Sequence, residues 1–363
     1  MRRVFISLPI FVLAFLQHID SYAEDLKIGA ALSLSGPYAN YGTQALHGIE
    51  LAINEVNESG GVNGRKIKLI VEDEGTLDLR RATAAAHKLV DADKVDVLLP
   101  LIVEDSEVIV PITSRVPIFT MVVGCGARKC GFNLGKYNVR APSSHDAIIQ
   151  KLTEYINSQG AKHSCVIASE STYFEAYGRL IEEIQTKAGK QVTYAAVPLS
   201  NTEDYRDVAT RFKAKECDAI FSWIPMGSIG SFFRRVREIG SKAILVGIVE
   251  TDDPQILNAA GKAAEGVVFA RFSLGSKAFQ KRFKERYSEM PSRPAIPAYD
   301  GVKLLLKLIG KVGTDAKALR EAILAVQNET AENGIMRFTS EGDREGEQVE
   351  LMQIRDGIAH KIQ

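Results

Sequence analysis

Apolar strands and amphipathic helices alternate along almost the whole chain. The clearest case begins at Leu26, where a strand leads through a glycine-containing turn, 35–42, into a helix. Apolar residues in that helix are spaced three or four apart and share one face: Ala45, Ile49, Ala52, Ile53 and Val56. Gly60 and Gly61 end the helix, and a second strand follows from Lys66. The pattern predicts a βαβ unit, and therefore a parallel sheet with a right-handed crossover.

The alternation continues as two consecutive series, each long enough to build a sheet of its own. The first series ends near Arg140, and the second begins with a helix at Ser144. The break between them predicts a crossing from one domain to another. After about residue 276 the chain is basic and mostly helical, and the tail from Met336 predicts a hairpin with its turn at 340–343. A chain that returns helices and strands to two domains would cross between them more than once.

The N-terminal segment has the pattern of a secretory signal peptide. Arg2 and Arg3 precede an apolar run, 4–16, that is short for a membrane span. The Ser21-Tyr22-Ala23 sequence fits the small-x-small pattern before a cleavage site. We expect cleavage after Ala23 and export of the mature chain. An uncleaved membrane anchor is the alternative.

The composition is that of a globular protein with room for two domains of ordinary size. The chain has 363 residues, of which 45% are hydrophobic and 25% charged. The 45 basic and 45 acidic residues balance to a net charge of zero, so nothing indicates nucleic-acid binding.

Motifs for catalysis are absent from the sequence. It has no Gly-x-Ser-x-Gly elbow, no His-Glu-x-x-His and no phosphate-binding loop. His47, His87, His145 and His163 have no base-like or metal-like partner nearby in sequence, which favours solvated or capping roles. We expect no cofactor and no metal site.

The cysteines suggest disulfides, since export permits them. Cys125 and Cys130 flank small, flexible residues that could let the two sulfur atoms meet. Cys165 begins a predicted strand and Cys217 directly precedes another, so these two pair if the strands are neighbours. A zinc site would need more ligands than the first pair supplies. The connectivity itself stays open at the level of sequence.

Polar and aromatic residues repeatedly follow the predicted strands. In open parallel sheets, ligands bind beyond the carboxyl ends of the strands. If two such sheets face each other, all these ends meet at one crevice with stacking faces and hydrogen-bonding groups, which is typical of a small-molecule site. The candidate residues are Tyr41, Glu104, Asp105, Gly124, Cys125, Tyr173, Trp223, Met226 and Glu250.

Several segments also carry a recognisable family pattern: residues 28–42, 48–57, 60–65, 263–267 and 298–302. Their order resembles the periplasmic branched-chain amino-acid (Leu/Ile/Val)-binding proteins, the type I solute-binding components of ABC transporters. The resemblance implies a two-lobed α/β fold, the Venus flytrap, with parallel sheets flanked by helices and three hinge crossings. The crossings would lie near 139–143, 269–274 and 334–338. The implied division is residues 1–23 as signal peptide, 24–141 plus 272–334 as lobe 1, and 142–271 plus 335–363 as lobe 2.

The resemblance also implies roles for several candidates. Tyr41 and Tyr173 match aromatic residues of the family site, and Glu250 matches the acid that pairs with a ligand ammonium group. Gly124 and Cys125 match the loop whose backbone N–H groups meet a ligand carboxylate.

One stretch departs from the family pattern. Members that bind amino acids have small hydroxyl residues where this chain has Glu104 and Asp105. These two carboxylates would repel a ligand carboxylate. Cys125 likewise replaces a usual hydroxyl residue. The departure weakens the case for an α-amino acid ligand.

The implied function is capture of a small amino acid or a related metabolite, such as an amide, an amine or an aromatic acid. The protein would deliver it to a membrane permease, as a monomer and without chemistry on the ligand. A sensor module that reports to a membrane receptor is one alternative. An exported enzyme on the same fold is another, and it would require a catalytic set that the motif search does not find.

Overall fold

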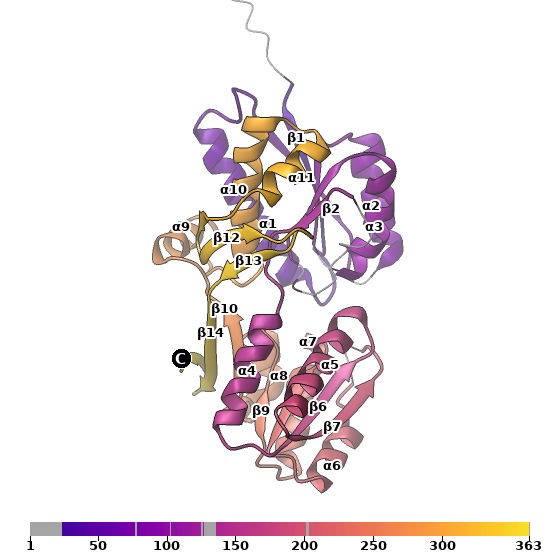
Figure 1. Ribbon diagram of the computed structural model, residues 1–363, viewed down its shortest axis with the longest axis vertical. Coiled ribbons are helices and arrows are strands. Elements are labelled where there is room, and N and C mark those ends of the chain that lie inside the picture. The colour runs from indigo at the N-terminus through magenta and orange to yellow at the C-terminus, as the bar shows by residue number, and fades with distance from the viewer. Residues whose placement is uncertain are drawn as a thin grey trace, which may run out of the picture.

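The computed structural model describes residues 24–76, 78–101, 103–124, 126, 136–200 and 203–362, with backbone only at 103–107 and 110. The proposed signal segment, Cys125 and Cys130 lie outside the described residues, as do the side chains of Glu104 and Asp105. The described chain folds into two α/β lobes, one above the other in Figure 1, each with its own hydrophobic core. No helix in these ranges combines the length and the apolar character that a membrane crossing needs.

Lobe 1, the upper one in Figure 1, is built on a five-stranded parallel sheet of order β2-β1-β3-β4-β5. Ile28 of β1 pairs with Leu69 of β2 on one side and with Val97 of β3 on the other, which confirms the predicted βαβ unit. Its elements are β1 (Leu26–Leu32), α1 (Ala39–Glu58), β2 (Ile67–Asp73), α2 (Leu79–His87), η1 (Lys88–Ala92), β3 (Val97–Pro100), α3 (Val103–Arg115), β4 (Phe119–Val122), β5 (Asn138–Arg140), α9 (Lys277–Tyr287), α10 (Ala295–Val312) and α11 (Ala316–Leu324).

Two glycines let α1 lie close to its neighbours. A Cβ atom at Gly42 would lie 2.0 Å from the carbonyl oxygen of Ser33, just beyond β1. A Cβ atom at Gly48 would lie 2.2 Å from the carbonyl oxygen of Ala295, at the start of α10. Neither position has room for a side chain unless the backbone moves. The start of α1 is therefore held against the carboxyl end of β1, the edge at which open parallel sheets bind ligands.

Lobe 2 is built on a seven-stranded sheet of order β15-β14-β10-β9-β8-β6-β7. Its elements are α4 (Asp146–Ser158), β6 (His163–Ser169), α5 (Thr172–Lys187), β7 (Gln191–Val197), α6 (Arg206–Ala214), β8 (Ala219–Trp223), α7 (Met226–Glu238), β9 (Ile244–Val246), α8 (Pro254–Ala260), η2 (Gly261–Ala264), β10 (Val268–Phe272), β14 (Val349–Arg355) and β15 (Ile358–Lys361). Strands β6 to β10 are parallel, as predicted.

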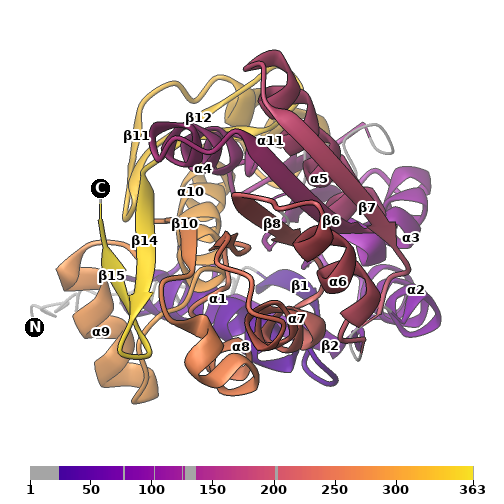
Figure 2. The same cartoon turned by 90° about the horizontal axis from the view of Figure 1, so that it is seen from below.

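The sheet of lobe 2 is mixed rather than parallel throughout. Figure 2 shows β14 and β15 at one edge, beside β10. β14 runs antiparallel to β10 and forms a hairpin with β15. The hairpin turn contains Asp356 and Gly357, both with positive φ, as a tight two-residue turn requires.

A small antiparallel sheet contains β11 (Glu329–Ala331), β12 (Gly334–Phe338) and β13 (Arg344–Glu347). β12 and β13 form the hairpin predicted for the tail. The expected division places residues 335–363 in lobe 2, but Met336 and Phe338 pack in the core of lobe 1. We therefore propose that the third crossing lies between β13 and β14, and that residues 335–347 belong to lobe 1.

Two buried arginines hold the connecting segments together. Arg140 of β5 forms an ion pair with Asp343, with 2.7 Å between Nε and Oδ1. Arg344 of β13 forms an ion pair with Asp300 of α10 at 3.2 Å and donates to the carbonyl oxygen of Ala141 at 3.1 Å. Both guanidinium groups are fully buried, so little water screens these pairs. The contacts tie the first crossing to the chain that leads to the third.

Candidate ligand site between the lobes

The strand order places a ligand crevice at the same point in each lobe. In lobe 1, β1 lies between β2 and β3, and in lobe 2, β6 lies between β7 and β8. Such reversals of strand order are the points where open α/β sheets bind ligands. The lobes touch near the start of α1, where Tyr38 packs against the core of lobe 2. Asn40 there donates to Asp253 of lobe 2, with 3.4 Å between Nδ2 and Oδ2.

A cavity of about 340 Å³ lies between the lobes and is lined from both. Three expected site residues line it: Tyr41 of α1, Met226 at the start of α7 and Glu250. Arg271 of β10 and Arg293, which precedes α10, also line it. The site therefore combines apolar, acidic and basic side chains from both lobes.

Tyr41 connects the first turn to the end of β4. Its hydroxyl group donates to the carbonyl oxygen of Gly124 at 2.7 Å. Burial raises the pKa of Tyr41, so the hydroxyl stays protonated and remains a donor. The N–H of Gly124 donates to the carbonyl oxygen of Leu101 at 2.9 Å. The Gly124 N–H is therefore not available to contact a ligand carboxylate, which is the role that the resemblance implies for it.

Tyr173 belongs to a buried aromatic group beside the crossing. Its hydroxyl lies 2.9 Å from Nδ1 of His145, and the backbone N–H of His145 donates to the hydroxyl of Tyr177 at 2.9 Å. That hydroxyl in turn donates to the carbonyl oxygen of Gly126 at 2.7 Å. The group joins the start of α5 to the segment that leads into α4.

His145 is not the solvated residue that the sequence predicts, and although it stands at the N-cap position of α4, its side chain makes no capping hydrogen bond. It is 3% exposed, and its side chain lies among Tyr173, Tyr177 and Phe272. Burial, together with the guanidinium groups of Arg293 and Arg140, holds its pKa well below the usual value. His145 is therefore neutral. His163 is also buried, which corrects the same prediction there.

Trp223 lies elsewhere than expected. It ends β8, is fully buried in the core of lobe 2, and its ring centre lies 6.0 Å from that of Tyr177. It is not among the residues that line the 340 Å³ cavity. Glu104, Asp105 and Cys125 cannot be placed in the site, because their side chains lie outside the described part of the chain.

Charged side chains of both signs line the cavity: Glu250, Asp252, Asp253, Glu289, Arg271 and Arg293. Burial raises the pKa of Glu250 to about 7, although Arg293 acts in the opposite direction. Arg293 is 6% exposed and was missed by the sequence reasoning, which took 291–294 only as a break between helices. The one local signal is an arginine inside a proline-bounded break. It does not reveal burial, which depends on packing against His145 and Phe272.

A larger hollow of about 680 Å³ lies on lobe 1 alone, between α10 and the β11–β12 hairpin. Its lysines are already paired: Lys303 with Glu55 at 3.0 Å and Lys307 with Glu329 at 2.7 Å. Closure of the lobes would not enclose this hollow, and its lysines already form ion pairs within the protein.

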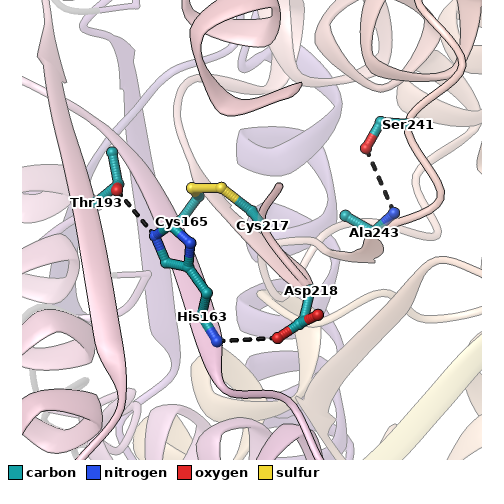
Figure 3. Close-up of a disulfide and its surroundings, with 7 residues drawn as sticks. All are labelled: His163, Cys165, Thr193, Cys217, Asp218, Ser241 and Ala243. Atoms are coloured by element: carbon teal, nitrogen blue, oxygen red, sulfur yellow. Dashed lines mark hydrogen bonds between the residues drawn. A yellow bond between two sulfur atoms is a disulfide. The ribbon is translucent and has the colours of Figure 1, made fainter. Parts of the chain in front are cut away.

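The expected disulfide between Cys165 and Cys217 is present (Figure 3). The neighbouring strands β6 and β8 pair in parallel, as the prediction required. His163 lies close enough to complete a group of three possible metal ligands, but the two sulfur atoms are bonded to each other. His163 instead contacts Thr193, with 2.9 Å between Nε2 and Oγ1. The disulfide lies at the amino ends of the strands, away from the interlobe cavity.

Comparisons with known proteins identify the family and the fold. The profile of the periplasmic binding protein family matches residues 25–358. The Leu/Ile/Val-binding protein homolog 7 of Brucella suis biovar 1 is 25% identical over 95% of this chain and 93% of its own length.

Two solved structures have the same fold. One is the leucine-binding protein LivK of Thermotoga maritima, with a TM-score of 0.84, 21% identity and coverage of 93% of this chain and 97% of that one. The other is a solute-binding protein of an ABC transporter from Rhodopseudomonas palustris in complex with 3,4-dihydroxybenzoic acid, with a TM-score of 0.80, 23% identity and coverage of 93% and 96%. The family match spans nearly the entire described chain, so this protein belongs to the periplasmic binding protein family, with the type I fold of the branched-chain amino-acid-binding proteins.

Proposed function

We propose that this protein is the substrate-binding component of an ABC importer, and that it captures a small metabolite between its lobes. One observation carries the proposal: the cavity is lined from both lobes, by Tyr41 on one side and Met226 and Glu250 on the other. A ligand there would contact both lobes at once and so favour their closed arrangement. The family match over residues 25–358 supports the same role.

The proposed ligands are small amino acids and related acids. The relatives named above include a leucine-binding protein and a protein in complex with 3,4-dihydroxybenzoic acid. The cavity of about 340 Å³ has the scale of such molecules. Tyr41 would cover an apolar or aromatic body, and Glu250 would meet a polar group.

The remaining parts of the role are proposed by analogy with the family. We propose export to the periplasm with cleavage after Ala23, action as a monomer, and delivery of the ligand to a membrane permease. Binding and release suffice for this task, so the protein would perform no chemistry on its ligand. The neutral His145, held by Tyr173 and Arg293, fits a positioning role better than one in proton transfer.

A thermal melt against a panel of compounds tests the proposal. The panel contains amino acids, amides, amines and aromatic acids, with sodium chloride at matched ionic strength as the control. A ligand at about a hundred times its dissociation constant adds roughly 2.7 kcal/mol to the free energy of unfolding. We expect at least one compound to raise the melting temperature by several degrees. A panel without any shift would contradict the proposal.

A further inference from the structure

Arg293 occupies an unusual place for a charged side chain. It lies in the short segment between α9 and α10, lines the interlobe cavity and is 6% exposed. Arginine is almost never buried to this degree without a partner of opposite charge, because the guanidinium group loses its hydration. The groups around the Arg293 guanidinium therefore indicate which kind of partner it can bind.

Protein groups contact only some of the hydrogen-bond donors of the Arg293 guanidinium group. Nη2 lies 3.3 Å from Nε2 of the neutral His145, and Cζ lies over the ring of Phe272, 4.5 Å from its centre. Within the described residues, Nε and Nη1 have no hydrogen-bond partner, and no carboxylate lies within ion-pair distance of Arg293. An arginine has five N–H donors, so most of its hydrogen-bonding capacity remains unused.

The two acids whose pKa values are lowered by the charge of Arg293 do not take up this capacity. Arg293 lowers the pKa of Glu347, but Arg344 lowers it more strongly. The carboxylate oxygens of Glu347 accept hydrogen bonds from Ser143 and Asn333. Glu250 lines the same cavity, yet burial outweighs the attraction of Arg293 and keeps its pKa raised. Three further acids line the cavity, and each has another partner: Asp252 pairs with Arg271, Glu289 contacts His47, and Asp253 accepts from Asn40 and Gln255. Among the described residues, no carboxylate therefore pairs with Arg293.

From this geometry we infer that Arg293 is the anchor for an anionic group of the ligand, and that the ligand is a small carboxylate with an apolar body. This inference rests on the proposed function and names its ligand class. Nε and Nη1 lie on different edges of the guanidinium group, and each can donate to a carboxylate oxygen. A carboxylate suits such an edge, because guanidinium and carboxylate groups are both planar and forked. Tyr41, Met226, Val249 and Leu274 line the same cavity and would cover the apolar body. An ammonium group on the ligand is not required for this contact.

Paired probes test the inference on the mature, full-length protein. Each pair has an acid and its neutral analogue: benzoate with benzamide, and L-leucine with L-leucinol. Isothermal titration calorimetry measures each affinity for the wild type, Arg293→Gln and Arg293→Lys. Arg337→Gln is the matched control, because Arg337 forms an exposed ion pair with Glu345 at 2.9 Å.

We expect one acid to bind the wild type at least on the order of 100-fold more tightly than its neutral analogue. Arg293→Gln should remove this preference, Arg293→Lys should retain part of it, and Arg337→Gln should leave it unchanged. Because Arg293 lacks an ion-pair partner, Arg293→Gln should also melt at or above the temperature of the wild type without ligand. An unchanged or higher melting temperature would show that Arg293 serves ligand binding rather than the stability of the fold.

Other outcomes would overturn the inference. If an acid binds Arg293→Gln as tightly as the wild type, or if neutral compounds or amines bind and acids do not, the inference fails while the proposed function stands. If no compound of these pairs or of the wider panel binds, both fail.

Discussion

The hydroxyl group of Tyr41 donates a hydrogen bond to the carbonyl oxygen of Gly124 at 2.7 Å. This bond links the start of α1 to the loop after β4, and so fixes the ring of Tyr41 at the wall of the interlobe cavity. The ring and the hydroxyl therefore have separate tasks: the ring can face a ligand, while the hydroxyl holds the ring in place.

Two substitutions separate these tasks. Tyr41→Ala removes the ring and should weaken ligand binding by about 1–3 kcal/mol if the ring covers the ligand. Tyr41→Phe keeps the ring and loses only the bond to Gly124, so its affinity should stay closer to that of the wild type. Calorimetry with the tightest compound of the panel measures both. Wild-type affinity in Tyr41→Ala would remove this residue from the site.

Glu250 should make the stability of the unliganded protein depend on pH. Its pKa is raised to about 7 in the folded protein, whereas an unfolded glutamate titrates near 4.3. The folded state therefore binds more protons between about pH 4.5 and pH 7, so this residue's contribution to stability falls as the pH rises through that window.

Glu250→Gln removes this titration. The melting temperature of the variant relative to the wild type should rise from pH 4.5 to pH 7 and level off above that. Melts of both proteins in the same buffers give the difference directly, and other titrating groups cancel from it. A difference that stays constant across this range would show that Glu250 titrates normally.

The ion pair between Arg344 and Asp300 should matter to stability more than any exposed pair. Both side chains are buried, and the atoms Nη2 and Oδ2 lie 3.2 Å apart. Asp300→Asn would leave the guanidinium group of Arg344 without its closest countercharge and should cost roughly 3 kcal/mol. Urea unfolding measures the change. Glu345→Gln breaks the exposed pair with Arg337 and serves as the control, with an expected cost below about 1 kcal/mol. Equal costs for the two variants would contradict this prediction.

The disulfide should stabilise the protein without contributing to binding. It joins Cys165 to Cys217 across 52 residues of chain. A variant with serine at both positions should lose about 2–4 kcal/mol of unfolding free energy. Ligand affinity should stay unchanged, because the bond lies at the amino ends of β6 and β8 and the cavity lies at the opposite ends. A variant that unfolds as the wild type does in urea, or that loses affinity, would disagree with this assignment.

The sequence predicted those features that local patterns determine. The βαβ unit from Leu26 onward follows from strand and helix periodicity, and Tyr41, Met226 and Glu250 follow from their positions after predicted strands. The hairpin of β14 and β15 also had a local signal, the Asp356-Gly357 pair, which the sequence reasoning did not use. Its strands add an antiparallel edge to lobe 2.

The features that the sequence could not predict depend on distant packing. Arg293 and His145 are 148 positions apart, and only the folded chain brings their side chains together. The location of Trp223 also depends on distant packing. Its position at a strand end suggests a place in the cleft wall, but its ring lies in the core. The placement of Met336 and Phe338 in lobe 1 likewise follows from tertiary contacts.

Amide hydrogen exchange, with and without the tightest-binding compound, tests the central claim most directly. A ligand held between the lobes should slow exchange in both: in residues 36–44 of lobe 1 and in residues 226–230 and 249–256 of lobe 2. The hollow between α10 and β11 is a built-in control, because a ligand there would protect lobe 1 alone. Protection in both lobes is the predicted result. Protection confined to one lobe would contradict binding in the cleft.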